Sequence, residues 1–592
     1  MKTTNYIKAI CAAALLLVSL GAAAQEETNL TREMTLEREY DPTVQDANKV
    51  NSLPKVKEPE IRKIPIDYAA TTIPGFPSKE VTLLPSGNIA TDMEYNKRRG
   101  YLNLGVGNYT NINGDLGYHI LSTPKDQLNI FFTHRSSNGN IKYVQDWLED
   151  EKVKAKLNDN LGGINFRHVF DRHTLTLGGH YQYTGFNYHG IYPSSTVTGK
   201  WIGDMLSSTW DENSHPFGDR ETNQVHQSFG ARIGLGTNPG ATDLGYKVDL
   251  SYTNFSQKYA YLKAIDGVTE HSVQGTVDIF APVATSQQLG VRANMNYFLY
   301  SSPIDSAYNN YLVGTINPYY RVEGSNWNLL LGANILFNTG DFDRLRVSPN
   351  IAANVEIADK TVFYLKAGGG VRNNSLNELS RVNRYANPWS TGPKTYELLD
   401  ALVGFKSGVA PGFWFDVFGG YQITDYNCFF IPTLYNPERD FSQAMTLFMP
   451  DSKRFLFGAS LKYAYQNMFE VNLKGVYSNW KVTTEDADGN EVEHKPYGAP
   501  GFEFTANFML RPIEKVSLAL DYNLQTGRYI GPSFGEEKMK NLNDLNFTGT
   551  YSINDTFGLY VKLNNLLFQK YEVFSGYPTQ GFNLMGGINI SF

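Results

Sequence analysis

Apolar and polar residues alternate along most of this chain, and the alternation is clearest in residues 581–592. One face of this stretch carries Phe582, Leu584, Gly586, Ile588, Ile590 and Phe592, whereas the other carries Asn583, Met585, Gly587, Asn589 and Ser591. A period of two predicts a β-strand with one apolar and one mostly polar side. The stretch therefore reads as an amphipathic strand that ends on an aromatic residue.

The same alternation recurs from residue 98 onward. It is found in residues 102–107, 174–183, 246–253, 503–511, 516–523 and 559–564, and charged residues such as Lys247, Asp249 and Lys562 fall on the polar face. Many amphipathic segments of about ten residues, each separated by turn residues, are typical of an outer-membrane β-barrel. We predict an all-β fold, a closed antiparallel transmembrane β-barrel of about 22 strands over residues 98–592.

Short and long connections alternate along the predicted barrel. Short turns are expected at 170–173, 238–241, 323–326, 358–360, 409–412, 511–514 and 553–555. Long loops are expected at 138–153, 188–223, 258–267, 371–396, 429–452, 482–500, 527–538 and 568–579. Short periplasmic turns and long external loops are usual in bacterial barrels. We also expect a β-bulge at Gly162-Gly163 and a hidden hairpin after Cys428.

The first 97 residues have a different character. Residues 1–24 combine Lys2 and Lys8 with an apolar run and the small residues 22–24, which predicts a cleaved signal peptide and export to the outer membrane. Residues 25–97 are rich in proline and predict an extended N-terminal arm. This arm is a disordered spacer, a segment that enters the barrel lumen, or a docking segment for a periplasmic or outer-membrane partner protein.

The composition agrees with a barrel and excludes some function classes. Aromatic residues make up 14% of the chain, and the mean hydropathy of -0.35 argues against many long apolar helices. The net charge of -7 gives no basic footprint for nucleic acid. Cys11 lies in the predicted signal peptide, so Cys428 is the one cysteine expected after cleavage and no intrachain disulfide is predicted.

Two blocks of sequence resemble the TonB-dependent outer-membrane receptor family. The first contains Asn387-Pro388, Gly392-Pro393-Lys394 and Tyr396-Glu397, and the second contains Asn564-Asn565-Leu566-Leu567, Lys570-Tyr571-Glu572 and Gly576-Tyr577-Pro578. The resemblance implies the receptor barrel, contact with outer-membrane lipid and possible energy coupling through TonB. The family's usual plug domain is longer than residues 25–97, and Met34-Thr35-Leu36-Glu37 is the candidate coupling box.

The chain shows no pattern that predicts an enzyme. Its histidines are scattered, so we expect no catalytic, cofactor-binding or metal-binding residues and no cofactor. Asp486 to Glu491 reads as a solvated acidic turn, while Trp147, Trp201, Trp210 and His215 lie in loops that bind a ligand or anchor the barrel at the membrane border. The predicted function is a transport-class barrel, passing a solute or serving as the membrane subunit of an uptake or assembly complex. The alternatives are a TonB-coupled receptor that uses the arm as a reduced plug, and a non-transporting scaffold or adhesin.

Overall fold

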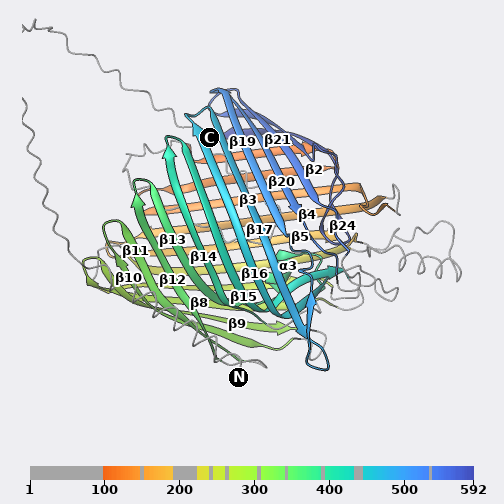
Figure 1. The fold of residues 1–592 in the computed structure, drawn as a ribbon. Helices are drawn as coiled ribbons and strands as arrows, with labels where there is room; N and C mark the ends of the chain where they lie inside the picture. The colour runs from red at the N-terminus through yellow and green to blue at the C-terminus, as the bar shows by residue number, and fades with distance from the viewer. Residues whose placement is uncertain are drawn as a thin grey trace, which may run out of the picture. The chain divides into compact units, whose positions relative to one another are not determined.

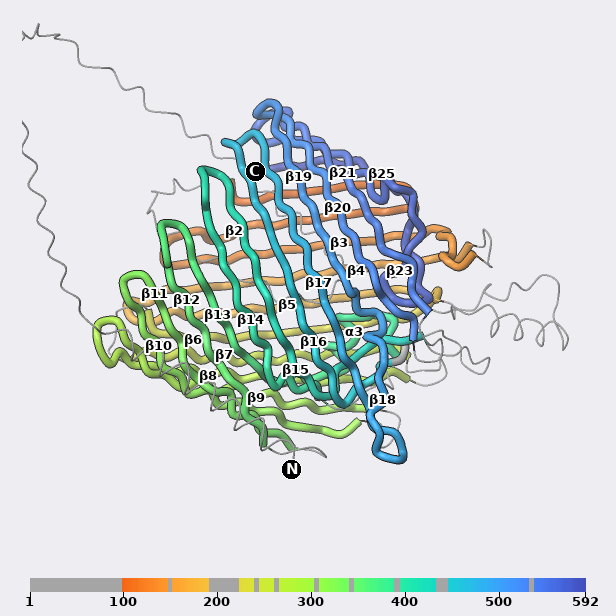
Figure 2. The backbone as a smooth tube through the Cα atoms, in the orientation of Figure 1, coloured from red at the N-terminus to blue at the C-terminus, as the bar shows by residue number. Residues whose placement is uncertain are grey.

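The computed structural model describes residues 98–146, 152–190, 223–238, 244–259, 266–302, 308–339, 345–387, 394–432, 444–531 and 537–592. Within them, one antiparallel sheet closes on itself, because its first strand pairs with both its second and its last strand. Figure 1 and Figure 2 show the strands running side by side around this ring. The predicted closed barrel of 22 strands is confirmed in the described residues. The predicted signal peptide and arm, residues 1–97, lie outside them.

The ring follows the order of the sequence. Its first half consists of β1 Gly100–Gly107, β2 Asn111–Ser122, β3 Asp126–Lys142, β4 Lys152–Val169, β5 His173–Asn187, β6 Asn223–Thr237, β7 Gly245–Gln257, β8 Thr269–Ala284, β9 Gln287–Ser301, β10 Tyr311–Glu323 and β11 Trp327–Asn338. Its second half consists of β12 Leu345–Ala358, β13 Thr361–Arg372, β14 Thr395–Ala410, β15 Phe413–Pro432, β16 Ala444–Tyr465, β17 Phe469–Glu485, β19 Phe502–Ile513, β20 Val516–Thr526, β21 Leu542–Ser552, β22 Phe557–Asn564 and β25 Asn583–Ser591.

The remaining elements lie in the connections. β18 Glu491–His494 pairs only with β17, so it extends a hairpin without joining the ring. β23 Glu572–Phe574 and β24 Tyr577–Pro578 form a small separate sheet. The helix α3 Leu376–Val382 begins at Ser375, whose hydroxyl accepts a hydrogen bond from the amide of Glu378. The sequence pattern did not predict this helix, and no helix in the described residues is long and apolar enough to cross a membrane.

The alternation predicted from the sequence corresponds to two faces of the ring. On β9, Leu289, Val291 and Met295 are between 47% and 56% exposed. Arg292, which alternates with them, pairs with Asp278 of the neighbouring strand. In a barrel in lipid, an exposed apolar face contacts the bilayer and the polar face lines the lumen.

The two ends of the ring have different connections. Turns at 170–172, 324–326, 359–360, 411–412 and 553–556 join strands at one end, here called the short-turn end. The connections after β3, β5, β7, β13, β15, β20 and β22 all lie at the other end, here called the long-loop end. The predicted alternation of short turns and long loops is therefore confirmed for these connections.

The predicted bulge at Gly162-Gly163 is wrong. β4 pairs with β3 in unbroken register through this point, with Gly162 opposite Phe132 and Gly163 opposite Phe131. A Cβ on Gly163 would lie 2.6 Å from Cζ of Phe131, so the glycine leaves room for that ring on the inner face. Register shifts occur elsewhere, including Gly368/Gly370 in β13 and Glu397/Leu399 in β14.

Two predicted loops are shorter than expected because their flanking strands continue. β15 runs to Pro432 and β16 begins at Ala444, so Cys428 lies in a strand and its following residues pair with β16. This extension is supported by apolar packing, since Phe429 and Met449 join one buried cluster with Tyr497. Likewise, β17 and β18 form a hairpin within the predicted loop 482–500.

Candidate functional site

Few of the residues singled out from the sequence meet one another. His180 lies on β5 with its ring over Gly230 of β6, and His494 lies in β18 beside Thr484. Asp486 accepts hydrogen bonds from the amides of Asp488 and Asn490, which confirms a turn at this acidic tip. Trp147, Trp201, Trp210 and His215 lie outside the described residues.

The described residues that gather from distant parts of the chain lie instead in connections at the long-loop end. We name as the mouth layer residues 143–146, 187–190, 373–387, 528–531, 537–540 and 571–578. Three of its segments follow β5, β13 and β22. Around the ring, β6 to β13 separate the first connection from the second, β14 to β22 separate the second from the third, and β25 with β1 to β5 separates the third from the first. Segments so widely spaced on a closed ring meet only by extending inward across its mouth.

Aromatic rings join these three segments. The rings of Tyr385 and Tyr577 stack with their centroids 3.9 Å apart and an interplanar angle of 11°. His189 packs edge-on against both, with a centroid distance of 5.4 Å to each. We call these three residues the aromatic clasp. Aromatic pairs contribute about 0.5–1.5 kcal/mol beyond the area they bury, so the clasp stabilises contact between the segments.

The helix α3 fixes the 373–387 segment to strands β7 and β8. The Ser375 hydroxyl donates to one carboxylate oxygen of Glu270 over 3.0 Å, and the Asn377 amide donates to the other over 3.2 Å. The Gln257 side-chain amide donates to the Ser380 hydroxyl over 3.1 Å. β8 and β7 lie five and six strands around the ring from β13, so these bonds tie α3 to a distant part of the wall.

Arg528 holds a second junction in the mouth layer. Its guanidinium donates to the carbonyl oxygens of Glu572, Val573 and Lys540 over 2.8, 3.2 and 3.1 Å. The Glu572 carboxylate accepts from the Gln145 side chain over 2.7 Å. Lys540 Nζ in turn donates to the carbonyl oxygen of Val144 over 2.9 Å. Arg528 thus links the connections that follow β20 and β22, and Glu572 and Lys540 join the connection after β3 to this junction.

Burial controls the charge of several groups in the mouth layer. It lowers the pKa of His189 to about 4, and the nearby positive charge of Arg384 acts in the same direction, although hydrogen bonds with the backbone of Asn187 and Pro578 oppose both. His189 is therefore neutral at pH 7. Burial also raises the pKa of the Glu572 carboxyl, against the effect of the Gly576 amide and other donors.

Ion pairs cover the inner wall of the barrel below the mouth layer. Arg135 lies 2.8 Å from Asp115, and Arg232 lies 2.6 Å from Asp249. Arg292 similarly lies 2.6 Å from Asp278, and Arg346 pairs with Asp425. Each pair joins charges of opposite sign on the inner face, so the wall is polar without a continuous row of one charge.

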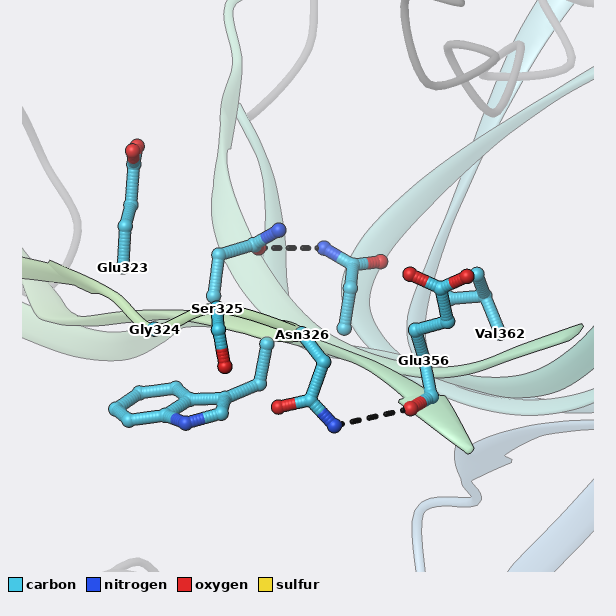
Figure 3. A pocket seen from close by; sticks show the side chains of 9 residues that line it. Glu323, Gly324, Ser325, Asn326, Glu356 and Val362 are labelled. Carbon is cyan, nitrogen blue, oxygen red and sulfur yellow. Dashed lines mark hydrogen bonds between the residues drawn. The ribbon is translucent and has the colours of Figure 1, made fainter. Parts of the chain in front are cut away.

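A small open hollow lies at the short-turn end, between the β10–β11 turn and strands β12 and β13 (Figure 3). Its volume is about 320 Å³, and its lining includes Glu323, Trp327 and Glu356. The Asn326 side chain donates to the Glu356 carbonyl oxygen over 3.1 Å, and Asn354 donates to Asn328 over 2.7 Å. These bonds hold the turn against the neighbouring strand.

No group of three or more histidine, cysteine or carboxylate side chains suited to a metal occurs in the described ranges. Sequence reasoning missed the mouth layer as a unit. A signal was present, because Tyr577 lies in the Gly576-Tyr577-Pro578 block and Tyr385 stands just before Asn387-Pro388. The pattern of each block alone does not reveal that the two tyrosines stack.

Comparison with known proteins adds a relationship of fold. No protein-family model and no curated protein sequence matches this chain. Among solved structures, the FrpB iron transporter of Neisseria meningitidis superposes with a TM-score of 0.61 at 10% identity, over 84% of this chain and 82% of that one. The ferric-catecholate import receptor Fiu of E. coli K12 gives a TM-score of 0.57 at 10% identity, over 84% and 82%.

A mutant of the ferric enterobactin receptor PfeA of Pseudomonas aeruginosa also resembles this chain, with a TM-score of 0.57 at 9% identity over 83% of this chain and 80% of that one. These structures are named as receptors and a transporter, and none is named as an enzyme. The resemblance drawn from the two sequence blocks is thus confirmed at the level of architecture: the chain has the 22-strand barrel fold of TonB-dependent outer-membrane receptors.

Proposed function

We propose that this protein is a transport-class barrel of the outer membrane, with its long-loop end facing outward and the mouth layer closing that end. It passes a solute or forms the membrane subunit of a larger uptake or assembly complex. The observation that carries the proposal is the meeting of the three clasp segments across the mouth of a closed ring with a polar inner wall. A closure built from loops can open, whereas a core filled by strand side chains cannot.

The predicted arm, residues 25–97, has a separate part in this proposal. In our proposal it docks a periplasmic or outer-membrane partner, or a TonB-type energy-coupling protein. The receptor-like barrel fold supports such coupling, and the candidate coupling box at Met34 to Glu37 is the first segment to test.

Single-channel conductance in a planar bilayer tests the proposal. Four proteins are compared: the full chain, a variant lacking residues 25–97, a variant with 376–386 replaced by a Gly/Ser linker, and a control with Gly/Ser in place of turn 486–490. The control alters a hairpin whose Asp486 turn lies outside the mouth layer. We expect the full chain and the control to stay closed and the 376–386 variant to conduct.

The other outcomes separate the rival functions. Conductance after removal of residues 25–97 alone would make the arm the plug, and would move the closure away from the mouth layer. If every variant stays closed, the barrel carries no flux, and the scaffold or adhesin function replaces the transport function.

A further inference from the structure

The outer face of β4 near the long-loop end is basic. Lys152, Lys154 and Lys156 alternate along β4 with Val153 and Ala155. The lysines are exposed, whereas Val153 is only 9% exposed and packs with Ile141 and Tyr143. The period of two therefore turns all three lysines to the outside of the barrel.

The inner face of the same strands is held in place, which fixes the direction of the lysines. Ile141, Tyr143 and Val153 form a buried cluster against Tyr109. The Tyr143 hydroxyl donates to the carbonyl oxygen of His189 over 3.3 Å, so the cluster is bonded to the mouth layer. Rotating the lysines inward would expose this cluster.

Polar side chains of β3 complete the outer face. Asn140 lies opposite Lys154 and Asn138 lies opposite Lys156 in the antiparallel register. Both asparagines are exposed, and their amides are hydrogen-bond donors beside the ammonium groups. Alternate residues of a strand are about 7 Å apart, so neighbouring lysines can donate to one phosphate group between them.

The polar outer face continues along β4 toward the short-turn end, to the level at which the neighbouring strand β5 carries tyrosines. Asn160 donates to Asn158 over 2.8 Å and lies 2.7 Å from Nδ1 of His134. On β5, the residue opposite Asn160 is Tyr183, followed toward the short-turn end by Tyr181, which is 49% exposed. Aromatic residues are usual at the border of a membrane. The three lysines precede Asn160 on β4, so they lie beyond this aromatic level, on its long-loop side, where headgroups surround a barrel.

No carboxylate neutralises the three lysines within the residues that the structure describes. The nearest described carboxylates along the chain are Asp146 and Asp159. Asp146 pairs with Lys540 at 2.7 Å, and Asp159 accepts from Thr184 over 2.6 Å on the inner face. Among the described residues of β3 and β4 near the long-loop end, this outer face therefore carries lysines and no carboxylate.

We propose that Lys152, Lys154 and Lys156, with Asn138 and Asn140, form a binding site for the phosphate of an anionic lipid headgroup. The site rests on the membrane location proposed above. Lipid phosphate is the occupant because the lysines face outward just beyond the aromatic level that marks the membrane border, and because its negative charge complements the three ammonium groups.

Native mass spectrometry of the full chain tests this site. The protein is released from micelles that contain either phosphatidylglycerol, which is anionic, or phosphatidylcholine, which is zwitterionic. Each lysine near an anionic surface contributes about fivefold to binding, so the triple variant K152Q/K154Q/K156Q should bind phosphatidylglycerol on the order of 100-fold more weakly. Binding of phosphatidylcholine should not change.

A matched control is available on β16 and β17. Lys453 and Lys481 also face outward, but each pairs with a carboxylate, Asp451 at 2.9 Å and Glu491 at 2.7 Å. The variant K453Q/K481Q should therefore retain wild-type binding. Heat-modifiable migration in gel electrophoresis verifies that each variant is a folded barrel.

Three results would overturn the site: equal binding of the two lipids by the wild type, unchanged phosphatidylglycerol binding in the triple variant, or full displacement of the lipid by millimolar inorganic phosphate. The last would mean a free-anion site. The proposed function is tested separately by conductance. If a variant conducts as expected but the protein does not retain anionic lipid, the lipid site is refuted and the proposed transport function is not.

Discussion

Acidification should loosen the mouth layer through His189. This side chain is buried between Tyr385 and Tyr577, and its pKa is lowered from 6.5 to about 4. If the layer opens and His189 meets water, the ordinary pKa of 6.5 returns. The stabilisation from keeping His189 neutral is therefore complete above pH 6.5 and is lost as the pH falls toward 4.

The size of the effect follows from the two pKa values. One pKa unit corresponds to about 1.36 kcal/mol, so the full difference is about 3 kcal/mol. At pH 5 the closed layer has lost about 2 kcal/mol of this stabilisation, which shifts the equilibrium toward the open layer by about 20-fold relative to pH 7. The barrel wall should be unaffected, because the perturbation acts on the clasp.

Hydrogen exchange with mass spectrometry measures this shift. Protection factors, corrected for the intrinsic exchange rate at each pH, are compared for peptides covering 373–387 and 571–578. Between pH 7 and pH 5, wild type should lose about 20-fold more protection than H189F, because H189F keeps an aromatic ring in the clasp but cannot titrate. The pH dependence that remains in H189F belongs to other groups of the layer, such as the buried Glu572 carboxyl, whose raised pKa acts in the opposite direction. Equal pH dependence in H189F and wild type would refute the reasoning, and would point to another group such as the buried His226.

Two other predictions concern the mouth layer and the seam. R528M removes the donors to three carbonyl oxygens and should reduce the free energy of opening of 528–531, 537–540 and 571–578 by about 3 kcal/mol, again measured by hydrogen exchange. R511M, at the short-turn end, is the control, and equal protection in the two variants would contradict the role of Arg528. Deletion of Phe592, whose carbonyl oxygen accepts from the amides of Arg99 and Gly100, should lower the fraction of heat-modifiable barrel; an unchanged fraction would show that the seam closes without it.

The strands could be predicted from the sequence because local alternation decides which side of a strand faces lipid. Residues 246–253 and 503–511 show the principle, because consecutive residues there face lipid and lumen in turn. Glycine was harder to interpret. Gly163 resembles a bulge residue in sequence, yet its partner Phe131 is supplied by another strand, and only that contact explains the glycine.

The candidate site could not be predicted in the same way, because it consists of contacts between connections. Tyr385 and Tyr577 stand in unrelated segments, and their stacking depends on how far each connection extends across the mouth. The lysine row of β4 is a different case. Its alternation is visible in Lys152 to Lys156, but these residues were divided between a predicted long loop and the strand after it.

The pairing of β1 with β25 also determines when the barrel can form. Tyr101 pairs with Ser591 and Gly107 with Met585, and the side chain of Asn108 bonds to a residue 474 positions away. Closing a flexible loop of that length costs about 5 kcal/mol of chain entropy before any seam bond repays it. The ring therefore cannot close while the chain is being made or exported. The free edge of β1 must stay unpaired or be shielded by another protein until β25 arrives. Folding rate and the availability of a shielding chaperone, more than final stability, should therefore limit the yield of this protein.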